Sequence, residues 1–223
     1  MRILVLNGSP KSGGFIGGSL DVIAAHLERN GVDVIRVSLR DRRIDECVGC
    51  FNCLKTGACG RGDDVDGIIQ ELLDADGIVI GSPVRNGMTT ALYKRFYERI
   101  TYRLGFTLLL EGKYTLAISS VGLASGKGVN RKFLGLQDIG PHRSAYLFFR
   151  VGIPTAVTPE DVRPRLERAA DTLLRDVKTG RSRNPVARFA AALDRMMIRR
   201  WMLTRSPEAY AHVIDCWKRK DYM

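Results

Sequence analysis

The sequence of 223 residues predicts an α/β fold, a doubly wound parallel sheet of five strands. Three observations lead to this prediction. Short strands that are apolar on both faces alternate with amphipathic helices, as in a sheet that helices cover on each side. Loops rich in Gly, Ser and Pro follow the first and third strands. The composition, 45% hydrophobic and 26% charged, is that of a globular chain.

The first part of the chain begins the alternation. Residues 2–6 are a short apolar strand that runs into Asn-Gly-Ser-Pro. We expect a helix to follow the glycines, with Ser19 as its N-cap, and to stop at residues 30–31, because serine caps helices and glycine ends them. Residues 32–39 are the second expected strand. A second helix is expected to open at Asp63-Asp64.

The rest of the chain continues the pattern. Residues 77–80 form a fully apolar strand, residues 90–104 a helix and residues 114–121 a fourth strand. Residues 153–157 are the expected last strand, and the helix after them spans 159–177. Five such strands favour the flavodoxin-like order 2-1-3-4-5, in which a ligand binds at the carboxyl ends of strands one and three, where the winding reverses.

The loop after the first strand, NGSPKSGGFIGGSL, has the character of a phosphate-binding loop. Its glycines and hydroxyls let backbone N–H groups surround an anion at a helix N-terminus. It lacks the lysine of a Walker A motif and the spacing of GxGxxG, so a single terminal phosphate, as in FMN, suits it better than a dinucleotide. A flexible turn without function is the alternative.

Two more loops are expected at the same sheet edge. GSPVRNGMT follows the third strand and could bring the backbone amides of residues 84–88 against the edge of a flat ring. SSVGLASGKG follows the fourth strand and could close over the other side. Glycine-rich loops after strands are common, but three of them at one edge indicate a ligand site.

Localisation bears on how the cysteines are interpreted. No apolar run reaches the roughly 18 residues that span a bilayer. The N-terminus arrives at Asn7 and Gly8 too soon for a signal peptide. We therefore expect a cytoplasmic protein, in which clustered cysteines bind metal or do redox chemistry more often than they form disulfides.

The segment CVGCFNCLKTGAC holds four of the five cysteines in a C-x2-C-x2-C-x5-C spacing. They are Cys47, Cys50, Cys53 and Cys59. This spacing is close to that of bacterial ferredoxins, except that their fourth cysteine binds a second cluster. No second run exists here, so Cys59 would have to complete the same cluster. Structural zinc usually takes two C-x2-C knuckles with a longer spacer, and a disulfide would leave two thiols unexplained. A cluster, a zinc ion and a loop without metal all stay open.

The ordered set of motifs resembles the iron–sulfur flavoprotein branch of the NADPH-dependent FMN reductase family, over roughly residues 1–160. The motifs are G-S-P-K after the first strand, the four cysteines, the Asp-Asp pair and G-S-P-V after the third strand. The resemblance implies a flavodoxin-like fold, bound FMN, a 4Fe-4S cluster on the four cysteines, and homodimers or homotetramers.

The resemblance also implies particular FMN-binding positions. They are Ser9, Lys11, Gly18, Ser19 and Leu20 in the first loop, Pro83, Val84, Arg85, Asn86, Gly87 and Met88 in the second, and Ser120 and Gly122 in the third. One position departs from the family, which commonly has Tyr or Trp where this chain has Arg85. The chain thus has no aromatic side chain at this position to stack on the flavin.

The charge is uneven along the chain. Of 35 Lys and Arg against 24 Asp and Glu, a net +11, residues 181–223 hold ten and four, so this segment carries +6. We expect residues 1–180 to form the FMN-binding domain and residues 181–223 a basic helical extension. One helical face of the extension is apolar. Its residues are Val186, Phe189, Ala190, Leu193, Met196, Met197 and Trp201.

That face predicts a helix docked on its own domain or on a second subunit. A helix on a membrane surface is the alternative, since basic amphipathic helices with Trp bind there. Nucleic acid is not expected, because no recognised binding module accompanies the charge.

The predicted function is an NAD(P)H-dependent oxidoreductase that passes electrons through FMN and the cluster to a flavin, a quinone or another small acceptor. The alternatives are an electron carrier between redox proteins such as ferredoxin, without a nicotinamide site of its own, and an interaction protein that uses the basic helix.

Overall fold

The computed structural model describes residues 1–11, 13–122, 134, 136, 139–152, 156–180, 193, 196–197, 200–201 and 206–222. It contains a five-stranded sheet in the order β2-β1-β3-β4-β5, with every neighbouring pair parallel. The flavodoxin-like order predicted from the sequence is therefore confirmed. The strands are β1 (Arg2–Asn7), β2 (Asp33–Ser38), β3 (Gly77–Pro83), β4 (Tyr114–Val121) and β5 (His142–Arg150).

Helices follow the strands in alternation. The α-helices are α1 (Phe15–Arg29), α2 (Asn52–Thr56), α3 (Val65–Asp74), α4 (Ala91–Ile100), α6 (Arg163–Thr179) and α8 (Ala211–Arg219). Shorter turns are η1 (Leu39–Asp41), the π-helical η2 (Thr101–Gly105) and η4 (Pro207–Tyr210). No helix in the described part of the chain is long and apolar enough to cross a membrane.

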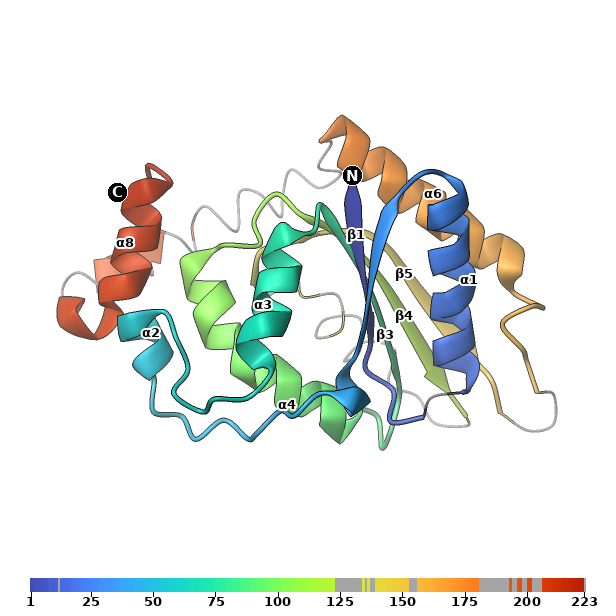
Figure 1. Cartoon of the computed structure of the whole chain (residues 1–223), viewed down its shortest axis with the longest axis horizontal. Helices are drawn as coiled ribbons and strands as arrows, with labels where there is room; N and C mark the ends of the chain where they lie inside the picture. The colour runs from blue at the N-terminus through green and yellow to red at the C-terminus, as the bar shows by residue number, and fades with distance from the viewer. Residues whose placement is uncertain are drawn as a thin grey trace.

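The helices cover both faces of the sheet (Figure 1). α1 and α6 pack on one face around Ile3, Val5 and Val79, and α3 and α4 pack on the other around Leu4, Leu6 and Ile80. Successive residues of a strand point to opposite faces, so each central strand contributes to both cores. This is why the strands are apolar on both faces.

Two elements lie elsewhere than the sequence predicts. The fifth strand is β5, His142–Arg150, and not residues 153–157, of which 156–157 are outside any strand and 153–155 are outside the described residues. β5 is an edge strand whose side chains are mostly half-buried, so it lacks the continuous apolar run that marks a central strand. Because polar and apolar residues are mixed in β5, its sequence does not show the apolar run by which a central strand is recognised.

The first helix begins at Phe15 rather than after Ser19. Its first turn, Phe-Ile-Gly-Gly, has poor helix propensity. Packing compensates, because Ile16 and Leu20 fit against Gly81 of β3, where a Cβ would lie 2.7 Å from Cγ2 of Ile16. The prediction of Ser19 as N-cap was therefore wrong, and Ser19 lies inside the helix.

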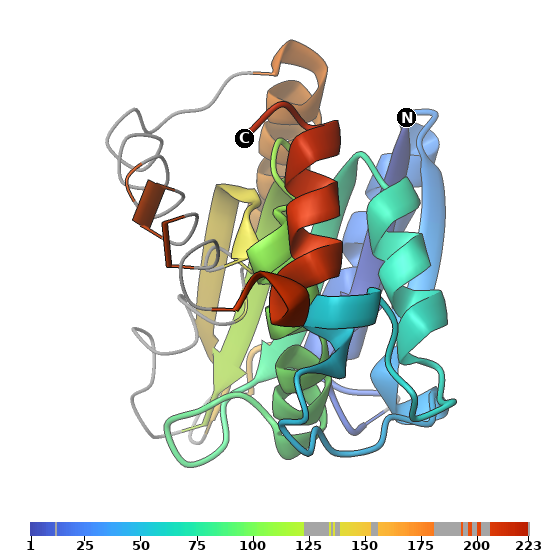
Figure 2. The same cartoon turned by 90° about the vertical axis from the view of Figure 1, so that its left-hand side faces the viewer.

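A third layer lies outside α3 and α4. α2, from the cysteine segment, and α8, from the C-terminus, pack side by side there (Figure 2). They share a small apolar core made by Leu54, Val213, Cys216 and Trp217. Most of the predicted tail helix, residues 185–204, lies outside the described residues. Of its apolar face, Leu193, Met196, Met197 and Trp201 are described and exposed.

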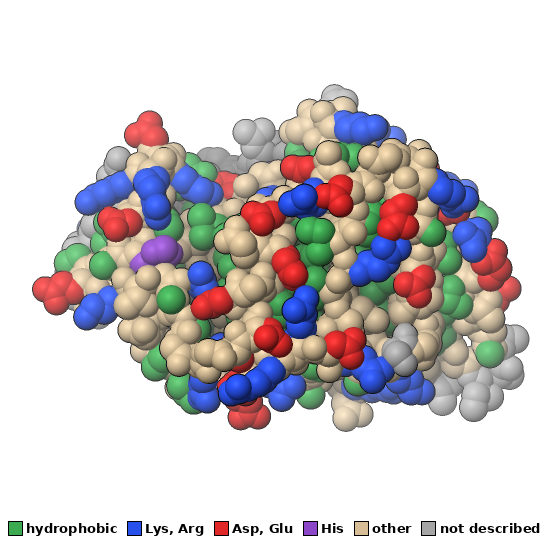
Figure 3. Space-filling view, viewed as in Figure 1, with side chains coloured by type: hydrophobic (Ala, Val, Ile, Leu, Met, Phe, Trp, Pro, Cys, Tyr) green, Lys and Arg blue, Asp and Glu red, His purple; other side chains and the backbone are tan. Residues whose placement is uncertain are grey.

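Charges of both signs are interspersed over α3, α4 and the neighbouring loops on the face shown in Figure 3. Several charged side chains of α3, α4 and the neighbouring loops pair, such as Lys94 with Glu98 and Arg42 with Glu71. The excess of basic residues is thus not gathered into one patch on this face.

Candidate functional site

The three glycine-rich loops meet at one edge of the sheet. In the register of the strands Asn7 lies opposite Gly81, and Pro83 lies opposite Ser120. The carboxyl ends of β1, β3 and β4 are therefore adjacent, and the chain leaves β1 towards one face and β3 towards the other. This is the switch point at which ligands bind in doubly wound sheets.

The first loop leads into an uncapped helix N-terminus. Gly18 N–H donates to Gly14 O at 2.9 Å, which begins the helical hydrogen bonding of α1. Among the described residues no side chain caps this turn, so the N–H groups of its first residues are available to an anion. Ser9 is buried, with its N–H on Asn7 Oδ1, and Lys11 beside it is exposed.

The other predicted residues of this loop sit within α1. Gly18 packs against Pro159, and Leu20 is part of the core. Ser19 is fully buried and its Oγ has no hydrogen-bond partner in the described structure. The structure thus brings Ser9 and Lys11 to the loop itself and sets Gly18, Ser19 and Leu20 behind it, in and beyond the first helical turn.

The second loop is a tight hairpin. Arg85 and Met88 exchange backbone hydrogen bonds of 2.7 and 2.9 Å. Between them Asn86 and Gly87 both have positive φ, 48° and 79°, as an Asn-Gly type I′ turn requires. Arg85, Asn86 and Met88 are exposed at its tip.

The base of this hairpin is fastened to β4. Pro83 ends β3, Val84 is buried, and Val84 N–H donates to Ser120 O at 2.7 Å. Ser120 is buried near the end of β4 and Gly122 is exposed just beyond it. The remainder of the third loop lies outside the described residues.

Thr90, which was not among the predicted site residues, joins the first two loops. Thr90 is the N-cap of α4, where its Oγ1 accepts from Tyr93 N–H at 3.1 Å and donates to Gly8 O at 2.7 Å. Gly8 also allows a close approach, since a Cβ there would lie 3.1 Å from Gly81 O. A threonine just before a helical pattern indicates an N-cap. The hydrogen bond from Thr90 to Gly8 joins distant parts of the chain, so the sequence gives no signal for it.

The four clustered cysteines line one pocket between their own segment and the helices α3 and α4. Helical residues on its wall include Val65 and Ile69 of α3, Arg99 of α4, and Tyr102 and Arg103 of η2. Cys47 and Cys50 are exposed, Cys53 and Cys59 are half-buried, and all four are free thiols. Spacing alone predicted the grouping, and the structure brings all four to this pocket.

The thiols influence one another. Burial raises the pKa of the Cys53 thiol, and the charges of Cys59, Cys47 and Cys50 raise it further. Within the described residues, no three His, Cys, Asp or Glu side chains are as close together as the ligands of one metal ion.

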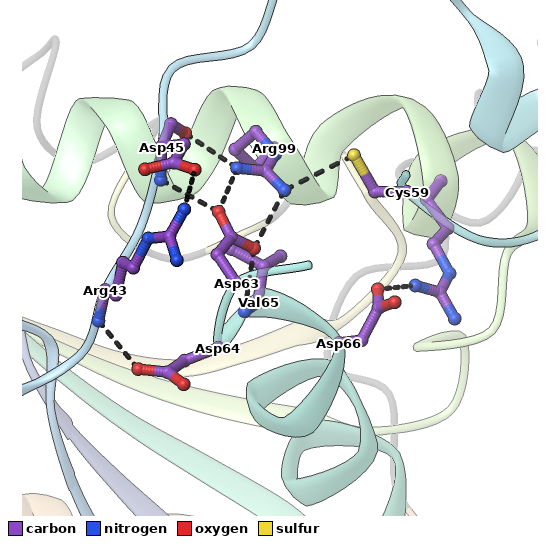
Figure 4. Close-up of polar contacts among 9 residues, drawn as sticks. Arg43, Asp45, Cys59, Asp63, Asp64, Val65, Asp66 and Arg99 are labelled. Atoms are coloured by element: carbon purple, nitrogen blue, oxygen red, sulfur yellow. Dashed lines mark hydrogen bonds and ion pairs between the residues drawn. The ribbon is translucent and has the colours of Figure 1, made fainter. Parts of the chain in front are cut away.

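A buried ion pair lies beneath this pocket and was not predicted (Figure 4). Arg99 donates to Asp63 from both terminal nitrogens, Nη1 to Oδ2 at 2.5 Å and Nη2 to Oδ1 at 3.0 Å. Arg99 Nη2 also donates to Cys59 Sγ at 3.3 Å. Both side chains of the pair are only 2% exposed. An arginine near a cysteine motif carries no sequence signal, because arginines on helices are mostly exposed.

Arg99 and Asp63 each stabilise the charged form of the other. Burial alone would raise the pKa of Asp63, but hydrogen bonds from Arg99 and from the backbone of Asp45 and Val65 bring it below its usual value. Burial lowers the pKa of Arg99, while the hydrogen bond and charge of Asp63 outweigh this and raise it. Both groups are thus held in their charged forms.

Aromatic rings and the C-terminus enclose the cysteine segment. Phe51 contacts Tyr102 edge-to-face, with centroids 4.9 Å apart. On the far side Trp217 of α8 is buried against α2, and its Nε1 donates to Phe106 O at 2.7 Å. The fifth cysteine, Cys216, is buried in this core rather than in the pocket of the other four.

Comparisons with known proteins bear on both sites. Residues 1–134, more than half of the chain, match the model of the NADPH-dependent FMN reductase family. An iron–sulfur flavoprotein of Methanocaldococcus jannaschii is 34% identical over 113 residues, which are 48% of this chain and 56% of that protein. An iron–sulfur flavoprotein of Clostridioides difficile is 24% identical over 224 residues, 99% of each chain.

Solved structures agree on the fold. A flavone reductase superposes with a TM-score of 0.61 at 18% identity, covering 81% of this chain and 63% of that one. An NADH:FMN oxidoreductase in its apo form gives 0.56 at 20% identity, covering 84% and 93%. At these identities the likeness concerns the fold alone. The matches to three archaeal iron–sulfur flavoproteins span 51% to 62% of the length of those proteins.

Proposed function

The chain belongs to the NADPH-dependent FMN reductase family, and from this premise we propose that it is an FMN-dependent oxidoreductase with a 4Fe-4S cluster on Cys47, Cys50, Cys53 and Cys59. The observation that carries the proposal is the pocket lined by four free thiols, on a chain whose strands β1, β3 and β4 end side by side at the switch point. The curated relatives of this chain are named as iron–sulfur flavoproteins.

The residues at the switch point suit FMN. The first turn of α1 presents uncapped N–H groups, and a phosphate is stabilised by such donors together with the helix dipole. Lys11 stands beside them to balance the phosphate charge. The hairpin at Arg85–Met88 would lie along the ring edge, where its exposed tip and fastened base give a firm wall.

The spacing of the four cysteines suits a cluster better than a single zinc ion. One zinc ion draws its ligands into a tight tetrahedron. A cubane cluster has an iron at each of several corners, so its sulfur ligands stand farther apart. The compact C-x2-C-x2-C-x5-C run is close to that of bacterial ferredoxins and has no second C-x2-C knuckle after a longer spacer, so it favours a cluster.

The residues of this chain would form two separate binding sites, one for FMN at the switch point and one for the cluster at the cysteines. Backbone N–H groups of the first loop would hold the phosphate, the hairpin would orient the ring, and the cysteines would hold iron as thiolates. Bound FMN supplies the exchange between the two-electron chemistry of a nicotinamide and the one-electron chemistry of a cluster. We propose a nicotinamide as the donor and a small molecule, such as a flavin or a quinone, as the acceptor.

The alternative function is that of an electron carrier between redox proteins, with the same two cofactors and no nicotinamide site. Exposure of Cys47 and Cys50 at the surface favours it, because a cluster near the surface can exchange electrons with a docked protein. Such a carrier would need no room for a nicotinamide over the flavin.

Two measurements test the proposal. Protein made and kept under anaerobic conditions is analysed for iron, flavin and its visible spectrum, and it is then mixed with NADPH or NADH in a stopped-flow instrument. We expect the purified protein to contain iron and FMN. We also expect NADPH or NADH to reduce the flavin in the stopped-flow experiment. Protein without iron would contradict the cluster. Loaded protein that neither nucleotide reduces would favour the carrier.

A further inference from the structure

Arg99 is the side chain that connects the buried ion pair to the cysteine pocket. It comes from the last turn of α4, 40 residues after Cys59, and is almost wholly buried. Each terminal nitrogen of its guanidinium has two acceptors. Nη1 donates to Asp63 Oδ2 and to Asp45 O, and Nη2 donates to Asp63 Oδ1 and to Cys59 Sγ.

This arrangement fixes the direction of the bond to sulfur. A guanidinium is planar, and the two-point contact with Asp63 sets both its position and its plane. With Nη1 also held by Asp45 O at 2.7 Å, the remaining N–H of Nη2 has one direction, towards Cys59. A lysine could pair with Asp63 but could not reproduce this fork.

We propose that Arg99 is a positioning residue for Cys59. Arg99 holds this ligand sulfur in place and raises the reduction potential of the cluster. The inference rests on the proposed function. Reduction adds one electron to the cluster, from FMN or from a chemical reductant, and spreads negative charge onto the ligand sulfurs. A hydrogen bond to such a sulfur stabilises the reduced form more than the oxidised form.

The effect belongs to the hydrogen bond rather than to net charge. Asp63 neutralises Arg99, so the pair as a whole brings no charge to the pocket. A second ion pair provides the matched comparison. Arg103 lines the same pocket and pairs with Asp66, but among the described hydrogen bonds it reaches no cysteine.

The experiment compares wild-type protein with three variants, all made under anaerobic conditions. Arg99→Lys keeps the charge opposite Asp63 and removes the fork. Arg99→Gln with Asp63→Asn removes the whole pair, so that no buried charge is left alone. Arg103→Gln with Asp66→Asn removes the neighbouring pair as the control. Iron per chain and FMN per chain are measured first, and the midpoint potential of the cluster is then found by a spectroscopic redox titration.

We expect both Arg99 variants to hold iron with a lowered cluster potential. At a fixed solution potential the ratio of reduced to oxidised cluster should fall about tenfold, a shift of about 59 mV for one electron, as the loss of a charged hydrogen bond predicts. The Arg103 control should shift much less. A purely structural role for Arg99 would lower iron content or thermal stability without moving the potential of the cluster that remains.

Each other outcome is decisive. Iron-loaded Arg99→Lys with the wild-type potential overturns the inference while leaving the proposed function intact. Equal shifts in the Arg99 and Arg103 double variants also overturn it, because the ion pairs would then act only through the local field. Wild-type protein that holds no iron contradicts the proposed function itself, which distinguishes the two failures.

Discussion

The imidazole ring of His212, in the C-terminal helix α8, lies directly over Gly57 at the end of α2. A Cβ on Gly57 would stand 2.4 Å from Cε1 and 2.5 Å from Nδ1 of that ring. The last residues of the chain thus close against the segment that carries the cysteines. The end of the expected basic extension, α8, is therefore packed on the domain, while residues 181–192, 194–195, 198–199 and 202–205 lie outside the described part of the chain.

Replacing Gly57 by alanine should loosen α8 from α2. Gly57 has a φ of 77°, which costs an L-residue about 1–2 kcal/mol, and the new methyl group would also collide with His212. The free energy of unfolding is measured in urea. Gly31→Ala is the control, because Gly31 has a φ of 74° with nothing near its Cβ position. Equal losses for the two variants would mean that the contact with His212 contributes nothing.

Trp217→Ala should uncover α2. The indole is 1% exposed, and removing such a side chain from a core costs about 3–5 kcal/mol. We expect faster hydrogen exchange in residues 52–56 and a lower ratio of iron to FMN, because α8 supports the cysteine segment and not the switch-point loops. Exchange rates by mass spectrometry, with iron and flavin analysis, check this. An unchanged ratio in a variant whose segment exchanges faster would show that iron does not depend on α8.

Acid should weaken the fold through Asp63. Its pKa lies below the ordinary value of 3.8, so its charged form stabilises the folded state. That contribution is complete above this value and disappears as the pH falls through the lower folded-state pKa. Asp63→Ala should cost about 3 kcal/mol at neutral pH, because Arg99 is left unpaired in the interior.

The measurement for Asp63 is urea unfolding at neutral and at acidic pH. The loss of stability between the two pH values should be smaller in the variant than in the wild type. Lys94→Gln is the control on the same helix, since its exposed pair with Glu98 is expected to contribute about 0.5 kcal/mol or less. Parallel acid curves for wild type and Asp63→Ala would rule out this source of pH dependence.

Cys53→Ser should remove iron and its broad absorption and leave FMN bound. Cys53, in α2, lines the pocket of the four thiols and packs against the small core of Leu54, Val213 and Trp217, whereas the loops at the switch point contain no cysteine. Iron and flavin analysis of anaerobic protein gives the result. Cys216→Ser is the matched control, because Cys216 is buried outside that pocket and should leave iron in place. If Cys216→Ser lost its iron while Cys53→Ser kept it, the role of Cys53 as an iron ligand would be contradicted.

Thr90→Val should weaken FMN binding and the fold together. The variant keeps the shape but loses both the N-cap of α4 and the bond to Gly8, at a cost of about 1–2 kcal/mol. Thr90→Ser keeps the hydroxyl and should restore both properties. The dissociation constant of FMN and the free energy of unfolding are measured on all three proteins. A valine variant that binds FMN normally would show that the link between the two loops is not needed for the cofactor.

Much of the fold could be predicted from residues 1–122. β1, β3 and β4 were found because central strands in a parallel sheet bury both faces, which leaves unbroken apolar runs such as residues 77–80. The Asn86-Gly87 pair belongs to a loop that was expected at the sheet edge, and the cysteine spacing marked the second site. The half-buried edge strand β5 and the start of α1 at Phe15 were not predicted, because each depends on what packs against it.

The sequence by itself determined the alternation of strands and helices, the strand order and the grouping of the four thiols. The periodicity of apolar residues and the spacing of the cysteines are properties of neighbouring residues, so they can be recognised without the structure. Only the tertiary structure decided that Arg99 reaches Cys59, that Thr90 joins the loops of β1 and β3, and that α8 covers α2. Arg99 and Cys59 are 40 positions apart and Thr90 and Gly8 are 82 apart, and a local sequence pattern does not indicate which distant side chain will fill a given space. Packing of the whole chain makes that choice.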